Sequence, residues 1–130
     1  MVIIEEAYEK IKTASKAYSF LNSPVRMSGE PTDEERGRNF VVKANEMVTF
    51  LDTKRLFFSG QEKKHIDAIN KLFRESWGEY TERMIISQNP TLRDRKKELE
   101  IWKKNWEDAD KEIPRLIGTL EDVFRKALGL

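Results

Sequence analysis

Apolar residues recur at every third or fourth position through residues 92–127, LRDRKKELEIWKKNWEDADKEIPRLIGTLEDVFRKA. This spacing matches the helical turn, so it places those residues on one face of an α-helix. Pro114 lies within the pattern, where it removes a backbone hydrogen bond and crowds the preceding turn; we expect a kink or local break near Asp110–Ile113. The pattern keeps its phase across the proline, which predicts that both halves face one core. The expected core face contains Leu92, Leu99, Trp102, Trp106, Ala109, Ile113, Leu116, Leu120, Val123 and Ala127.

Three further segments show the same periodicity, and local signals mark their ends. Pro24 follows the first segment and stops it, since a proline disfavours helical geometry in the residue before it. Thr32 and Ser59 each stand three residues before a glutamate, as in the capping box that starts many helices. The connection around residue 60 is short, which favours antiparallel neighbours. The expected helices cover about residues 3–21, 32–59, 61–88 and 91–128.

These segments predict an all-α fold: a four-helix, mainly antiparallel bundle with a long, Pro-kinked last helix, in one domain over residues 1–130. The second helix carries the widest apolar face, because Val41 and Val48 broaden a row of other apolar residues. A face of that width usually contacts two neighbours, so we expect this helix to lie inside the bundle. The row contains Phe40, Ala44, Met47, Leu51 and Phe58.

The composition restricts the function. The chain has 130 residues, of which 38% are hydrophobic and 36% are charged, and its formal net charge is +1. A nearly neutral chain is not drawn electrostatically to nucleic acid or to anionic membranes. The absence of cysteine excludes a disulfide framework and a thiolate nucleophile, and it fits a reducing compartment. No run of roughly 18 apolar residues is present to span a membrane, so we expect a cytoplasmic protein. The uncapped start, Val2-Ile3-Ile4, leaves an upstream membrane anchor open.

The closing stretch IPRLIGTLEDVFRKALG, residues 113–129, resembles the tail of uncharacterised bacterial helical proteins. In those proteins a Pro-led segment ends in Leu-Glu, Phe-Arg and Leu-Gly. The resemblance implies a bacterial origin and a helical bundle, which in some members follows an N-terminal membrane anchor. It implies no activity, so it assigns no functional residue to this chain.

The residues that carry catalytic and metal chemistry are scarce. His65 is the single histidine, and Glu62 precedes it by three residues. Glu-x-x-His on a helix is half of a carboxylate-bridged di-iron site, which needs a second such pair. Helical ribonuclease toxins need an arginine four to six residues before a histidine, and no arginine stands there. The acidic residues alternate with lysine and arginine at helical spacing, as on a solvated face. We therefore predict no catalytic, metal-binding or cofactor-binding residue, no cofactor, and a protein that is not an enzyme.

Two surfaces remain as candidates for binding. Leu56 and Phe57 lie off the apolar row of the second helix, so they either pack beneath the following turn or form a contact surface for another subunit or partner. A basic patch surrounds Trp102 and could contact phosphates. The patch contains Arg93, Lys96, Lys97, Lys103 and Lys104.

The favoured function is a non-enzymatic interaction or assembly module that self-associates, as a homo-oligomer and most simply a dimer, with a protein partner left open. The alternative is a nucleic-acid- or toxin-associated accessory protein that uses the basic start of the last helix. An enzyme with a carboxylate-only site ranks third. Nucleic acid is a weaker candidate partner than protein, because Asp94, Glu98 and Glu100 dilute the basic patch and no recognised binding module accompanies it.

Overall fold

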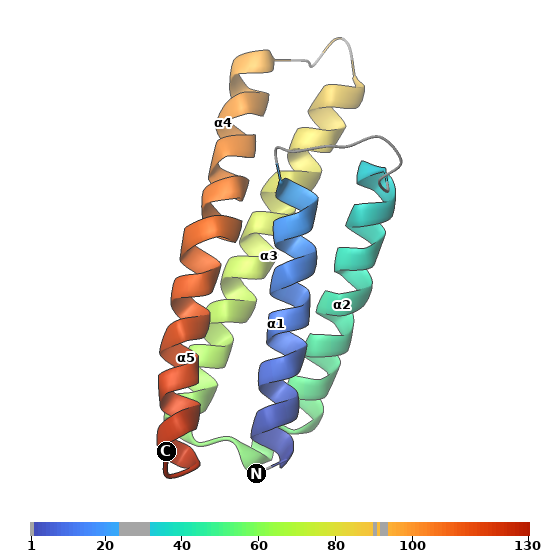
Figure 1. The fold of residues 1–130 in the computed structure, drawn as a ribbon. Helices are drawn as coiled ribbons and strands as arrows, with labels where there is room; N and C mark the ends of the chain where they lie inside the picture. The colour runs from blue at the N-terminus through green and yellow to red at the C-terminus, as the bar shows by residue number, and fades with distance from the viewer. Residues whose placement is uncertain (1, 24–31, 90, 92–93) are drawn as a thin grey trace.

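The computed structural model describes residues 2–23, 32–89, 91 and 94–130, and every regular element among them is helical. The elements pack as a four-helix bundle, in which α4 and α5 stack end to end as the fourth helix (Figure 1). Successive helices run in opposite directions, so both chain ends lie at one end of the bundle (Figure 1). The predicted all-α bundle is confirmed. Its elements are α1 (Val2–Asn22), α2 (Asp33–Thr53), η1 (Arg55–Phe57), α3 (Gly60–Gln88), α4 (Arg95–Glu107), η2 (Asp108–Glu112) and α5 (Ile113–Ala127).

The most deeply buried helix is α1. Its Ala7, Ile11, Ala14 and Tyr18 side chains are completely buried. Burial is complete because α1 packs against α2 on one side and against the fourth helix on the other. In contrast, α2 packs chiefly on α1, and its backbone rarely comes close to that of α3. The bundle is therefore open along the boundary between α2 and α3.

The expectation that α2 lies inside the bundle is wrong. Val48, expected to widen the buried face, is 39% exposed, and Val41 is only half-buried. Large aromatic side chains account for the difference, because they span the distance between α2 and α3. The ring of Phe40 lies 5.8 Å from that of Phe73 and 5.3 Å from that of Trp77, measured between centroids. One row of α2 thus reaches α3 while the adjacent row stays uncovered.

The connection between α2 and α3 is a short capped turn. Helix α2 ends at Thr53, earlier than the expected end at residue 59, and the 3-10 turn η1 follows it. Ser59 forms the predicted capping box: its Oγ accepts a hydrogen bond from the Glu62 amide at 3.1 Å, and its own amide donates to the Glu62 carboxylate at 2.9 Å. An N-cap residue needs an extended backbone, which Ser59 adopts. A helix that continued to residue 59 could not supply that geometry.

The fourth helix departs from regular α-helical geometry directly before Pro114, as the sequence predicts. The segment η2, which directly precedes α5, is π-helical, and Pro114 stands in the first turn of α5. A π-helical turn holds one more residue than an α-helical turn, so it frees the backbone that the proline ring would otherwise crowd. The local break expected near Asp110–Ile113 is present.

The π-helical turn also changes which residues of the fourth helix face the core. Two adjacent residues of this turn, Asp108 and Ala109, are both buried before the row continues at Ile113. The face expected from an unbroken pattern is therefore partly wrong: Leu99 is 50% exposed, whereas Ile117 and Phe124 are buried. Leu92, the first residue of the expected face, lies outside the described residues. The observed buried row is Asn105, Asp108, Ala109, Ile113, Ile117, Leu120 and Phe124, of which Ala109, Ile113 and Leu120 belong to the expected face.

Candidate interaction surfaces

Leu56 and Phe57 project from the turn between α2 and α3. Leu56 is 92% exposed and Phe57 is 61% exposed, whereas the adjacent Phe58 is buried and stacks on Phe124 with ring centroids 6.3 Å apart. This geometry removes the alternative in which Leu56 and Phe57 pack beneath the turn. The two side chains stand in solvent on a segment whose next residue is anchored in the core.

The turn that carries them is held from both sides. The Arg55 guanidinium donates to the two carboxylate oxygens of Asp67 at 2.9 and 3.1 Å. These hydrogen bonds lower the pKa of Asp67 below its ordinary value. The capping box at Ser59 fixes the other end of the turn. Leu56 and Phe57 are thus presented by a preorganised backbone, which reduces the ordering that a partner would have to impose.

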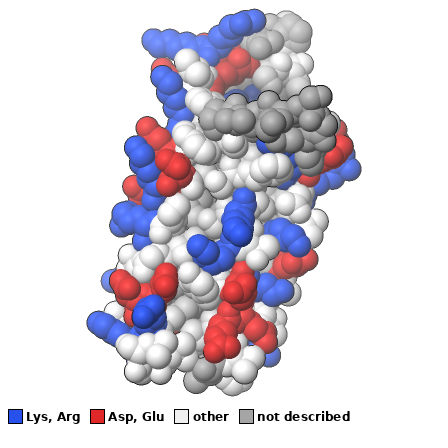
Figure 2. All heavy atoms as spheres, in the orientation of Figure 1, with Lys and Arg blue, Asp and Glu red and all other residues white. Residues whose placement is uncertain are grey.

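Further apolar residues are exposed at the same end of the bundle. Val2 at the start of α1 is 65% exposed and Leu130 at the end of the described chain is 77% exposed. A hollow of about 400 Å³ lies beside Phe57 and is also lined by Ile4, Val123 and Ala127. On the face shown in Figure 2, the lower end of the molecule is largely uncharged. We call Leu56 and Phe57, with Val2 and Leu130, the apolar end.

The basic patch is compensated by nearby acids. Arg93 lies outside the described residues, and Lys96 and Lys103 are exposed. Lys97 pairs with Glu82 at 3.1 Å. Figure 2 shows lysine and arginine over the start of α4, with acidic residues close by. Part of the positive charge that could bind phosphate is therefore already paired with a carboxylate.

Lys104, the remaining member of the basic patch, lies between two carboxylates. It pairs with Glu79 at 2.9 Å and with Asp108 at 3.1 Å. Partial burial disfavours its charged form, but the hydrogen bonds to Glu79 and Asp108 outweigh that effect and raise the pKa of Lys104. Lys104 stabilises the junction of α3 and the π-helical turn, and it is poorly placed to bind a phosphate.

A buried polar cluster joins three helices. The Tyr18 hydroxyl of α1 hydrogen-bonds to Ser76 Oγ of α3, and the Asn105 amide of α4 donates to the Ser76 carbonyl at 3.0 Å and to Ser76 Oγ at 3.2 Å. Burial raises the pKa of Tyr18, so its hydroxyl stays protonated. These groups are neutral and hydrogen-bonded to one another, and the Asn105 side-chain oxygen is buried without a hydrogen-bond partner among the described residues. The cluster is suited to fixing the register of the three helices, and it contains no paired nucleophile and base.

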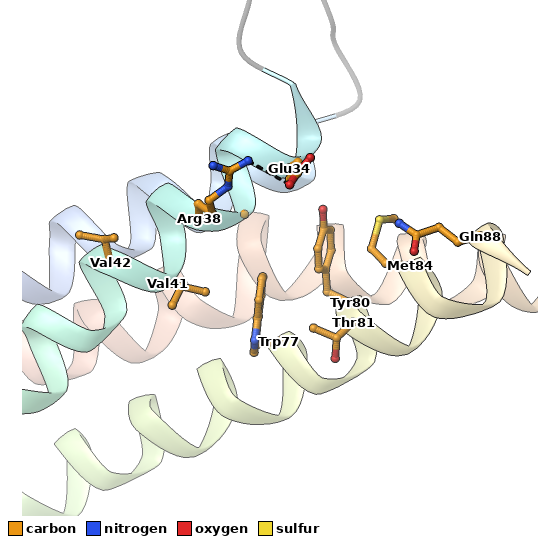
Figure 3. A pocket seen from close by; sticks show the side chains of 10 residues that line it. Glu34, Arg38, Val41, Val42, Trp77, Tyr80, Thr81, Met84 and Gln88 are labelled. Carbon is orange, nitrogen blue, oxygen red and sulfur yellow. Dashed lines mark ion pairs between the residues drawn. The ribbon is translucent and has the colours of Figure 1, made fainter.

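The open boundary between α2 and α3 forms an apolar groove that the sequence analysis did not identify. A hollow of about 570 Å³ lies there, and a second of about 340 Å³ continues it past Val41 and Trp77. Figure 3 shows Trp77, Tyr80 and Met84 of α3 opposite Val41 and Val42 of α2, with the Glu34–Arg38 ion pair at the rim. A sequence signal was available, since Val41 and Val42 add apolar width that one neighbouring helix cannot cover.

The glutamate–histidine pair, Glu62 and His65, lies in the first two turns of α3. Glu62 is buried and engaged in the capping box, and His65 is half-buried one turn further along α3. In residues 2–23, 32–89, 91 and 94–130, no three histidine or acidic side chains gather as metal ligands would. Within the same residues, no helix combines the length and the apolar character that crossing a bilayer requires.

No family model, curated protein or solved structure matches the chain.

Proposed function

We propose that this chain is a non-enzymatic interaction module that associates with itself, and that its apolar end is a contact surface. The observation that carries the proposal is the exposure of Leu56 and Phe57, at 92% and 61%. Single exposed apolar residues are common on proteins. Two adjacent ones on a fixed turn, beside a hollow and further exposed apolar residues, are typical of a contact surface.

Burial of this surface would contribute substantially to association, against a cost of about 4–15 kcal/mol for bringing two molecules together. Burying a leucine and a phenylalanine contributes about 1.5–3 kcal/mol each. A two-fold contact uses the same surface of both copies, so that contribution is counted twice.

The proposed location is the cytoplasm, which suits a chain without cysteine.

The alternative function, binding of nucleic acid through the basic start of α4, has weaker support. Lys97 and Lys104 already pair with acidic residues, and Lys104 lies against a buried carboxylate. A phosphate contact would have to break those pairs.

Sedimentation analysis of the whole chain tests the proposal. The wild type should sediment as a species larger than the monomer at high micromolar concentration. The variant with both Leu56→Glu and Phe57→Glu should associate more weakly while its circular dichroism spectrum stays helical. Ile85→Glu is the matched control, because Ile85 is 63% exposed and lies near the opposite end of α3. A wild type that stays monomeric, or a control that is equally affected, would refute the proposed contact surface.

A further inference from the structure

The outer face of α2 carries little charge, although 36% of the chain is charged. Val42 is 51% exposed and Val48 is 39% exposed on this face. The two charged residues nearest to its middle, Lys43 and Glu46, pair with each other at 4.0 Å. Charge reappears on the face only at its two ends, with Arg38 and Asp52. The uncharged middle, which we call the α2 ridge, consists of Val41, Val42, Asn45, Val48 and Thr49.

Part of the α2 ridge is symmetric in sequence about Asn45, whereas Val41 has Thr49 as its counterpart. Val42 and Val48 stand three residues before and after it, and Arg38 and Asp52 stand seven residues before and after it. A two-fold axis at the level of Asn45, perpendicular to the helix, would set each residue opposite its counterpart in a second α2 running the other way. Val42 would then meet Val48, and Arg38 of each copy would face Asp52 of the other.

Charge selects between the two possible helix directions. In the antiparallel arrangement Arg38 faces Asp52 of the second copy, whereas in a parallel arrangement Arg38 would face Arg38. Arg38 pairs within its own chain with Glu34 at 2.9 Å, and its side chain remains 70% exposed. A guanidinium has five donors, so it can bind a second carboxylate without releasing the first.

The surface on both sides of the α2 ridge is hollowed. The groove toward α3 comprises the hollows of about 570 and 340 Å³, and a further hollow of about 600 Å³ lies on the α1 side next to Lys10 and Phe50. Helices pack by setting the side-chain ridge of one into the groove of the other. A second α2 ridge beside the first would cover Trp77 and Val41, which line the groove (Figure 3).

We propose that a second copy of this chain docks on the α2 ridge, with the two α2 helices antiparallel about a two-fold axis at Asn45. The two Asn45 side chains then meet at the axis, where a pair of amides fixes the register of otherwise apolar contacts. The α2 ridge is separate from the apolar end. This inference shares with the proposed function only the claim that the chain associates with itself.

Cysteine cross-linking of the whole chain tests the geometry, because the chain has no cysteine of its own. Asn45→Cys should link to a second copy on mild oxidation. Val42→Cys and Val48→Cys should each link poorly alone but readily when mixed, since residue 42 faces residue 48 across the axis. Asn39→Cys, exposed on another side of α2, is the matched control. Self-linking of Val42→Cys and Val48→Cys alone, or linking of Asn45→Cys no faster than the control, would overturn the proposal.

A binding experiment separates this contact from the apolar end. In the background of Leu56→Glu with Phe57→Glu, the α2 contact is the one that remains. Adding Val48→Glu should then raise the dimer dissociation constant by about 100-fold, because both copies lose a buried valine.

Charge reversal in the same background supplies the second arm. Arg38→Asp and Asp52→Arg should each weaken the dimer, and the two together should restore it, since the reversed charges meet again across the axis. A double variant no tighter than the single variants would overturn the proposal. If the variant with Leu56→Glu and Phe57→Glu associates as tightly as the wild type and still cross-links through Asn45→Cys, the apolar end is not a contact surface, whereas the α2 contact is supported.

Discussion

Deleting one exposed residue from the π-helical turn tests how the fourth helix keeps its register. Without Lys111, the π-helical turn loses the one residue that it holds beyond an α-helical turn, so a regular α-helix would keep both halves of the buried row facing the core. Pro114 would then lie in the interior of a continuous α-helix, which costs about 3 kcal/mol. The deletion is therefore also made together with Pro114→Ala.

The two deletion variants in the Pro114→Ala background should differ widely in their free energies of unfolding. The deletion with Pro114→Ala should lie within about 1 kcal/mol of the wild type, because no buried side chain leaves the core. The matched control deletes Arg115, an exposed residue of α5, in the same Pro114→Ala background. That deletion turns the rest of α5 by about 100° and exposes three buried side chains at about 1.5–3 kcal/mol each, a loss comparable with the whole stability of a small domain. The side chains are Ile117, Leu120 and Phe124.

Urea unfolding followed by far-ultraviolet circular dichroism measures these differences. The Lys111 deletion alone should unfold about 3 kcal/mol more easily than its Pro114→Ala version. If the Lys111 and Arg115 deletions are equally destabilising in the Pro114→Ala background, the π-helical turn is not a register-keeping insertion and the explanation of the buried row fails.

Three further predictions concern stability. Ser59→Ala should lower the free energy of unfolding by about 1 kcal/mol in urea, because the N-cap hydrogen bond is lost. The pKa of Asp67 in the folded protein lies below its ordinary value of 3.8, so its ion pair with Arg55 stabilises the fold above pH 3.8 and this stabilisation is lost as the pH falls through the folded pKa. Thermal melts of Asp67→Asn should therefore show a smaller loss of melting temperature at acid pH than the wild type. Lys104→Glu should destabilise the fold by about 1–3 kcal/mol in thermal melts, because it sets a carboxylate beside the buried Asp108, whereas Lys103→Glu should change stability by about 0.5 kcal/mol or less.

The sequence predicts the parts of the fold that depend on neighbours in the chain. A capping box requires a hydroxyl three residues before a glutamate, so the spacing of Ser59 and Glu62 is enough to identify Ser59 as an N-cap. The local break before Pro114 follows from the missing amide of proline. The exposure of Leu56 and Phe57 was one of two alternatives, because periodicity shows that they leave the apolar row but does not show what covers them.

The sequence-based predictions that were wrong or missing concern packing between segments that are distant in the chain. The extra residue of the π-helical turn could not be recognised from the sequence, because the regular steps from Asn105 to Ala109 and from Ala109 to Ile113 fit the same stretch. Buried polar groups were missed for the same reason. Arg36 is 2% exposed and its guanidinium lies 4.0 Å from the Phe20 ring centroid, and Asn105 is completely buried, yet both residue types usually predict surface positions.

The buried polar cluster shows how α1, α3 and α4 can be held together without a polar contribution from α2. Hydrogen bonds between Tyr18, Ser76 and Asn105 fix α1, α3 and α4 relative to one another, and α2 contributes no member of that cluster. Helix α2 is held mainly by apolar packing on α1, so a partner can cover its outer side without rearranging the core.

The α2 ridge and the apolar end together determine what the assembly can become. Each proposed contact is two-fold, and the two surfaces lie at different places on one chain. A chain that uses both contacts joins a different copy through each of them, so association continues beyond the dimer unless the two axes cross and close a tetramer. Loss of either surface should then leave a discrete dimer, and loss of both should leave a monomer. On the face shown in Figure 2, charges of both signs are spread over the molecule, which disfavours further apolar contacts on that face.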